Sequence, residues 1–174
     1  MTYVISDLHG YPLEKLKKLL KKATFSSDDF LYILGDIIDR NGDGGVGILL
    51  WLLEQVNVQL ILGNHEAMLL SCDFVFDEIT EDSINAISSE KIELLNNYML
   101  NGGNATLKAL RNLPKNTQQD ILDYLRDCPL YEAVTASEKD FILVHSGFNN
   151  FNKNKKIRDY SSDDLLWARP ELDD

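Results

Sequence analysis

The stretch Tyr32-Ile33-Leu34-Gly35-Asp36-Ile37-Ile38-Asp39-Arg40 places an apolar run directly before a glycine and a group of charged residues. A short apolar run that ends at such a turn signal predicts a buried strand, here Phe30 to Leu34. The charged residues then follow the carboxyl end of the strand, which is where ligand sites form in open α/β sheets. This stretch therefore predicts an α/β fold with a polar site at a strand end.

The sequence on either side supports this interpretation. Apolar runs at Tyr3 to Ile5 and Val58 to Leu62 predict two more strands. Between the strands, we expect one helix from Pro12 to about Lys22, where leucines recur at helical spacing, and another from about Val46 to Glu54. A β-α-β-α-β order is typical of an α/β layered domain with parallel strands.

The second half of the chain is helical by pattern from about residue 82 to 127, with breaks at Gly102-Gly103 and Pro114. Strand character returns at Tyr131 to Thr135 and at Phe141 to Val144. No linker separates the helical segment from the rest, so we expect an insertion (82–127) that packs beside the sheet and not a second domain.

Composition limits the possible functions. A chain of 174 residues with 44% apolar residues fits one compact domain, residues 1–174. Its net charge of -11 argues against a nucleic-acid partner, and the sequence lacks the long apolar run of a membrane span. Cys72 and Cys128 are far apart and have no C-x-x-C partner, which favours free thiols in a reducing compartment. We expect a cytoplasmic protein; the sequence does not predict its oligomeric state.

All three histidines of the chain closely follow apolar runs. His9 comes after Val4-Ile5, His65 after Leu60-Ile61-Leu62, and His145 after Phe141-Ile142-Leu143-Val144. A single histidine is more often structural than a metal ligand. Because three histidines and Asp36 all have this placement, we expect them to meet in one site.

The side chains suit two divalent metal ions. Asp7 and His9 are two residues apart, so in an extended segment they point the same way and grip one ion. Asp36 has two oxygens that can bridge two ions, Asn64 offers an amide oxygen and His145 a second imidazole. Mixed oxygen and nitrogen ligands favour Mn, with Fe or Zn as alternatives. Two such ions about 3.5–4 Å apart clamp a phosphate and generate a hydroxide at neutral pH.

Three further residues complete a phosphate site. Arg40 lies in the same predicted loop as Asp36, and its guanidinium matches phosphate oxygens; a surface salt bridge is the alternative. His65 is placed to protonate a leaving group as a general acid. Asp39 is a candidate to orient the His65 imidazole.

Four segments together resemble the phosphoprotein phosphatase family of metallophosphoesterases. Ser6 to Gly10 is similar to its G-D-x-H-G motif and Gly35 to Asn41 to G-D-x-x-D-R-G, each with one substitution. Gly63 to Glu66 matches G-N-H-E, and Val144 to Gly147 is similar to a later V-H-A-G segment.

Two more segments resemble the bacterial and phage-lambda-type serine/threonine phosphatase branch. Asn101 to Leu107 is similar to N-G-G-x-x-T-L, although a helix break is the simpler local interpretation. Leu165 to Glu171 is similar to L-L-W-x-R-x-E, and this resemblance implies that Arg169 binds phosphate together with Arg40.

The resemblance also implies the role of each residue. It assigns one metal to Asp7, His9 and Asp36, and the second metal to Asp36, Asn64 and His145, with Asn64 also touching phosphate. It makes His65 the proton donor with Asp39 as its partner, and Glu66 a structural residue. The implied reaction is direct attack by metal-bound hydroxide.

The implied fold is a layered metallophosphatase-like β-sandwich flanked by helices, with the helical insertion. The family's final G-H-T-type motif, whose histidine completes the second metal site, is not found before Asp174. We therefore expect the family's last strands to be lacking and the second metal to be weakly held.

These features predict a serine/threonine protein phosphatase, acting on a phosphorylated protein or a small phosphate ester. One alternative is a dinucleoside polyphosphate hydrolase, which shares the motifs. Another is a phosphate-binding module with weak turnover because the last histidine is missing.

Overall fold

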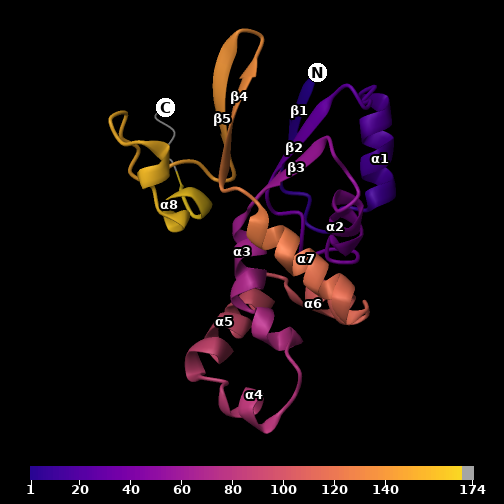
Figure 1. Ribbon diagram of the computed structural model, residues 1–174, viewed down its shortest axis with the longest axis vertical. Coiled ribbons are helices and arrows are strands. Elements are labelled where there is room, and N and C mark those ends of the chain that lie inside the picture. Colours follow the sequence, from indigo (N-terminus) through magenta and orange to yellow (C-terminus); the bar gives the residue numbers. More distant parts are fainter. Residues whose placement is uncertain (170–174) are drawn as a thin grey trace.

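A computed structural model describes residues 1–169 (Figure 1). Its centre is a parallel sheet in the order β1-β2-β3, formed by β1 (Thr2–Ile5), β2 (Phe30–Leu34) and β3 (Val58–Ile61). The strands begin and end within one residue of the expected positions. The α/β class with parallel strands is thus confirmed.

The helices that connect these strands bury one face of the sheet. α1 (Leu13–Lys22) follows Pro12 and buries Leu16, whereas Leu19 stays 48% exposed at the edge of the apolar stripe. α2 (Val46–Leu52) is apolar over most of its length and ends two residues earlier than expected. Both helices contribute buried residues to the same core as the strands.

The sequence did not predict the next helix. α3 (Asn64–Ser71) begins directly after β3, so Asn64 and His65 lie in the first turn of a helix and not in an open loop. Glu66, at the third helical position, accepts the Gly63 N–H at 3.0 Å and caps this end. A 3₁₀ turn, η1 (Asp73–Phe76), follows α3.

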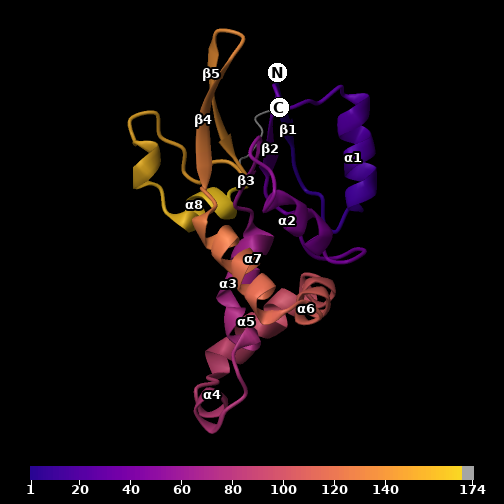
Figure 2. The same cartoon turned by 45° about the vertical axis from the view of Figure 1, so that its right-hand side comes forward.

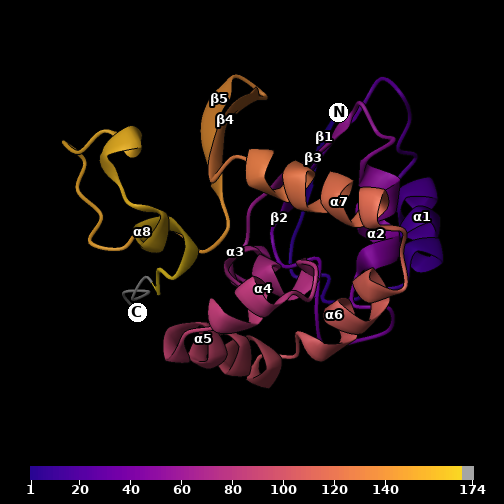
Figure 3. The ribbon, with the colours of Figure 1, turned by 60° about the horizontal axis from the view of Figure 1, so that its bottom comes forward.

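Four helices then form the lower part of the molecule in Figure 1: α4 (Glu81–Asn85), α5 (Ser89–Leu100), α6 (Asn104–Arg111) and α7 (Lys115–Asp127). Breaks between them fall at Asn101 to Gly103 and at Pro114, where the sequence predicted them. α5 and α7 both pack against α3, and Figure 3 shows α7 crossing in front of the parallel strands.

The last two strands form a sheet of their own. β4 (Tyr131–Ala136) and β5 (Lys139–Val144) pair as an antiparallel hairpin that stands apart from the parallel strands in Figures 1 and 2. His145 therefore follows a strand of the hairpin and not of the parallel sheet. The hairpin is followed by η2 (Ile157–Asp159) and α8 (Ser162–Leu166).

Within residues 1–169, no helix is both long enough and apolar enough to span a bilayer. Pro170 and Glu171, the end of the segment similar to L-L-W-x-R-x-E, lie outside the described residues.

Candidate metal centre

The loops that follow β1 and β2 run side by side. The His9 N–H donates to the Asp36 carbonyl at 2.9 Å, and the Gly10 N–H donates to the Ile37 carbonyl at 2.8 Å. These bonds extend the strand pairing beyond the sheet. They bring the polar residues of the two loops together at the carboxyl ends of the strands, as expected from the sequence.

The backbone in these loops is turned sharply. Asp7, His9 and Asp36 have φ values of 55°, 38° and 55°, in the left-handed region that side chains other than glycine rarely adopt. The expectation of an extended Asp7–His9 segment is therefore wrong, since β1 ends at Ile5. Asp39 and Arg40 share this conformation, with φ values of 75° and 68°. Strained backbone of this kind clusters at functional sites.

The buried carboxylate of Glu66 holds the β2 loop in place. It accepts the N–H groups of Asp36 and Ile37, each at 2.8 Å, and that of Ile38 at 3.3 Å, in addition to Gly63. Burial raises the pKa of Glu66, and the backbone donors oppose that shift. Gly63 is required here because a Cβ atom would collide with the Asp36 and Glu66 carboxylates.

Two imidazoles lie near different oxygens of the Asp36 carboxylate. The His9 Nδ1 atom lies 3.0 Å from the Ile38 carbonyl, and the His145 Nδ1 atom lies 2.7 Å from the Leu34 carbonyl. A carbonyl can only accept, so each neutral ring carries its proton on Nδ1 and leaves a lone pair on Nε2. His9 Nε2 is 3.7 Å from Asp36 Oδ2, and His145 Nε2 is 3.5 Å from Asp36 Oδ1.

This arrangement gathers side-chain acceptor atoms around Asp36, whose Oδ1 atom also accepts the His65 N–H at 3.1 Å. His145 Nε2 also lies 2.8 Å from Asn64 Oδ1, another acceptor in this orientation of the amide. Converging lone pairs are unfavourable unless a cation lies among them, so the donor set fits metal ions. Each Asp36 oxygen faces a different imidazole, so Asp36 could bind an ion on each oxygen.

The third imidazole of the cluster is fixed by a different partner. Ligand atoms of His9, Asp36 and His65 lie within 4.8 Å of one another. His65 Nδ1 donates to Asp39 Oδ2 at 2.6 Å, and Arg40 Nη2 donates to His65 Nε2 at 3.0 Å. The expected Asp39–His65 pair is present, and His65 Nε2 accepts from Arg40 because a guanidinium can only donate.

Asp39 is held in turn by two residues that the sequence did not single out. Its Oδ1 atom accepts the Tyr98 hydroxyl at 2.7 Å and the Thr106 hydroxyl at 2.6 Å, and Asp39 is fully buried. Burial and the Asp39 carboxylate raise the pKa of Tyr98, so its hydroxyl is a donor. Thr106 lies in the segment similar to N-G-G-x-x-T-L, which was the available signal for this role.

The glycines of that segment allow close packing on the site. The Arg40 N–H donates to the Gly102 carbonyl at 3.1 Å. Gly102 has a φ of 102°, and a Cβ atom there would lie 2.8 Å from the Arg40 side chain. A Cβ atom on Gly103 would likewise strike the Tyr98 ring. The helix break is therefore also a contact with the site.

Two expected residues lie outside this cluster. The Asp7 N–H donates to the Gly35 carbonyl at 3.3 Å, which puts Asp7 beside the site, but its side chain is exposed. Arg169 is exposed as well. It follows Ala168, whose N–H donates to Ser146 Oγ at 3.0 Å, so the backbone near Arg169 is tied to the residue after His145.

Glu66→Gln should destabilise the protein even without metal. The neutral amide is a weaker acceptor, and its NH₂ group would face backbone N–H groups that are buried and already directed inwards. We expect a loss of about 2–3 kcal/mol in the free energy of unfolding, measured by denaturant titration in the presence of a chelator. Glu54→Gln, at an exposed position, is the control. A Glu66→Gln protein as stable as this control would contradict the role of Glu66.

Comparison with known proteins agrees with this geometry. The model of the calcineurin-like phosphoesterase family matches residues 2–173. A symmetrical bis(5'-nucleosyl)-tetraphosphatase from Actinobacillus succinogenes is 35% identical over 151 residues, covering 85% of this chain and 44% of that protein. The corresponding protein from Salmonella paratyphi B is 30% identical over 148 residues, covering 84% and 43%. The chain spans less than half the length of these relatives.

A solved structure shares the fold. A crystal structure assigned provisionally to a diadenosine tetraphosphatase gives a TM-score of 0.57 at 21% identity, covering 94% of this chain and 56% of that one. The family model spans nearly the whole sequence, and the polar residues meet at the strand ends. The chain belongs to the calcineurin-like phosphoesterase family of metal-dependent hydrolases.

Proposed function

We propose that the protein hydrolyses dinucleoside tetraphosphates symmetrically, by cleaving the central linkage of the four-phosphate bridge. The observation that carries this proposal is the name shared by relatives that match more than four-fifths of the chain at 30–35% identity. These relatives favour the dinucleoside polyphosphate hydrolase over the serine/threonine protein phosphatase that the motifs first suggested. Symmetrical addition of water to such a bridge gives two nucleoside diphosphates.

The residues at the strand ends would hold two divalent metals. His9 and Asp36 would bind the first, with Asp7 turning inwards, and Asp36, Asn64 and His145 the second. When bound, such ions polarise a phosphate and lower the pKa of water. The nitrogen and oxygen donors favour Mn, with Fe or Zn as alternatives.

Arg40 and His65 would act on the phosphate itself. In the structure the Arg40 guanidinium donates to His65 Nε2. A phosphate oxygen is a stronger acceptor, so an arriving substrate would draw Arg40 away and leave Nε2 free to take up a proton from solvent, which it would then pass to the leaving group. Asp39 keeps the ring oriented throughout. Arg169, behind His145, would supply a second guanidinium.

The helices between residues 82 and 127 would support the site. We treat them as an insertion within a single domain, residues 1–174. Tyr98 comes from α5 and Thr106 from α6, and both bind Asp39. The insertion would thereby set the position of His65.

A substrate comparison tests the proposed function. With Mn²⁺ present, diadenosine tetraphosphate should be converted to ADP with a kcat/KM at least tenfold above that for a phosphoserine peptide. Chromatographic separation of the products checks both the rate and the site of cleavage. A preference for the peptide would overturn the proposal. Binding of the dinucleotide without turnover would instead identify a phosphate-binding module.

Tyr98→Phe should lower turnover with little effect on substrate binding. Removing a hydrogen bond to a buried carboxylate costs about 1.5–3 kcal/mol, and here the loss frees Asp39 to shift away from His65. We expect kcat for diadenosine tetraphosphate to fall about tenfold, with KM within about twofold of the original.

Tyr3→Phe is a matched control, since the Tyr3 hydroxyl donates to the Ala23 carbonyl at 2.8 Å, away from the site. A rise in KM with unchanged kcat in Tyr98→Phe would contradict a positioning role. So would equal kinetic effects in the two variants.

A further inference from the structure

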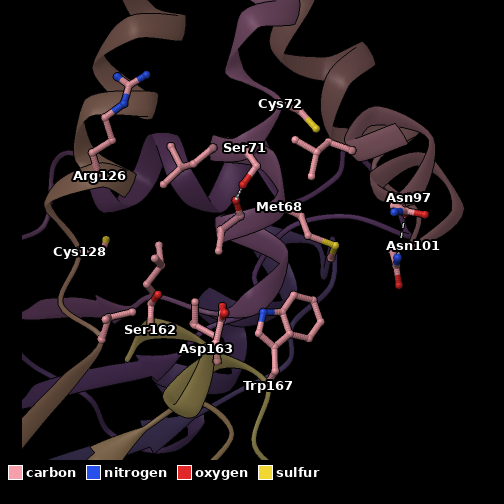
Figure 4. Close-up of a pocket in the computed structure, with 16 residues that line it drawn as sticks. Met68, Ser71, Cys72, Asn97, Asn101, Arg126, Cys128, Ser162, Asp163 and Trp167 are labelled. Carbon is pink, nitrogen blue, oxygen red and sulfur yellow. Dashed lines mark hydrogen bonds between the residues drawn. The ribbon is translucent and has the colours of Figure 1, made fainter. Parts of the chain in front are cut away.

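A groove of about 820 Å³ opens beside the metal centre, between α3, α5 and α8 and the end of α7 (Figure 4). We call it the α3–α8 groove. In Figure 4 the indole of Trp167 lies on one side and the Met68 side chain projects towards it from α3, with Asn97 and Asn101 on the α5 side. Its size suits a small-molecule ligand, since such pockets measure about 300–1,000 Å³.

The first wall of the groove starts at the metal centre. Asn64, Ala67, Met68 and Ser71 follow an i, i+3, i+4, i+7 pattern along α3, and therefore share one face of the helix. Asn64 contacts His145, while the other three line the groove. With a rise of about 1.5 Å per residue, Met68 lies about 6 Å along the helix from Asn64.

The second wall is tied to His145. Ser146 Oγ donates to the Leu165 carbonyl at 2.7 Å and accepts the Ala168 N–H at 3.0 Å, which fixes the end of α8 against the residue after His145. Trp167 lies between these two anchored residues. The backbone of Trp167 is therefore held near the residue after His145, and Trp167 is 49% exposed.

The third wall meets the arginine of the site. Asn101 lines the groove, and the next residue, Gly102, accepts the Arg40 N–H. Each of the three walls is thus adjacent in the chain, or hydrogen-bonded, to a residue that we propose binds metal or phosphate. A ligand that holds its phosphates at Arg40 and Asn64 would extend into the groove.

The lining suits a neutral aromatic group better than another phosphate. Arg126 is paired with Asp73 and Asp123, each at 2.6 Å, so its charge is already balanced. Burial raises the pKa of the Cys72 thiol to about 11 and that of Cys128 to about 12, so both thiols are uncharged.

The remaining lining residues match the parts of a nucleoside. An exposed indole stacks on a base, and the Asn97 and Asn101 amides can bond its polar edge. The Asp163 carboxylate, also in the lining, is an acceptor for ribose hydroxyls.

We propose that the α3–α8 groove binds one nucleoside of the substrate, with its base stacked on Trp167. This inference rests on the proposed function, because it gives the groove one end of a dinucleoside tetraphosphate. Asn64 and Met68 are about 6 Å apart along α3. This separation leaves room for the phosphates between the cleaved linkage and the nucleoside.

Calorimetric titration of the Mn²⁺-loaded protein with ADP and with inorganic pyrophosphate tests the groove. Both probes carry two phosphates, but only ADP has a nucleoside. We expect ADP to bind about tenfold more tightly, and Trp167→Ala to remove this advantage while pyrophosphate affinity stays within twofold. Equal affinities for the two probes in the unaltered protein, or undiminished ADP binding by Trp167→Ala, would overturn the inference.

Two further variants guard against a folding artefact. Trp167→Phe keeps an aromatic ring and should retain most of the ADP affinity, and Asn97→Ala, on the exposed side of α5, should lower it by a few-fold. Phe151→Ala is the control, since Phe151 is 72% exposed and outside the groove. If Trp167→Ala lowers the affinity for ADP and for pyrophosphate equally, the Asn97→Ala variant decides. An unchanged ADP affinity in Asn97→Ala would then overturn the inference. A lower ADP affinity with unchanged pyrophosphate affinity would support it.

The titration separates this inference from the proposed function, because it requires no turnover. Groove-dependent ADP binding without hydrolysis of diadenosine tetraphosphate would refute only the proposed function. If the protein hydrolyses the dinucleotide but the groove variants bind ADP with unchanged affinity, only the nucleoside site would be refuted.

Discussion

The Glu66 carboxylate accepts hydrogen bonds from the backbone of two separate loops, at Gly63 and at Asp36 to Ile38. It thereby fixes the ends of β2 and β3 relative to each other. A left-handed φ at Asp36 costs about 1–2 kcal/mol for a residue other than glycine, and the hydrogen bonds from Glu66 offset that cost. The direction of the Asp36 side chain depends on this constraint.

Further layers of contacts build on Asp36. Backbone carbonyls orient His9 and His145 so that their Nε2 lone pairs face the two oxygens of its carboxylate. Beside them, Tyr98 and Thr106 hold Asp39, and Asp39 holds His65. The proposed metal ligands and the Asp39–His65 pair are thus held by backbone carbonyls and by the Glu66, Tyr98 and Thr106 side chains.

The sequence predicted the parallel strands and most helices because their apolar residues recur at clear periods and end at glycine or proline. It failed where tertiary contacts decide the backbone. The turn at Asp7 to His9 depends on bonds to the β2 loop, and the start of α3 at Asn64 depends on capping by Glu66. Hydrophobic periodicity reveals neither the turn nor the start of this helix. Nor does local pattern show which strand the run before His145 pairs with, which in the structure is β4.

Within the candidate site, the sequence predicted the residue types and their common location but not all of their relations. The Asp39–His65 contact was expected, whereas the support from Tyr98 needs a packing arrangement across 59 residues of chain. The α3–α8 groove could likewise not be predicted from the sequence, since its walls come from segments far apart in the chain.

Anomalous scattering from crystals grown with Mn²⁺ tests the central claim, that Asp36 bridges two ions, most directly. We expect two peaks at the Asp36 carboxylate, one bonded to His9 Nε2 and the other to His145 Nε2 and Asn64. A single peak that does not touch Asp36, or a peak bonded to His65 Nε2 in place of His9, would contradict the account.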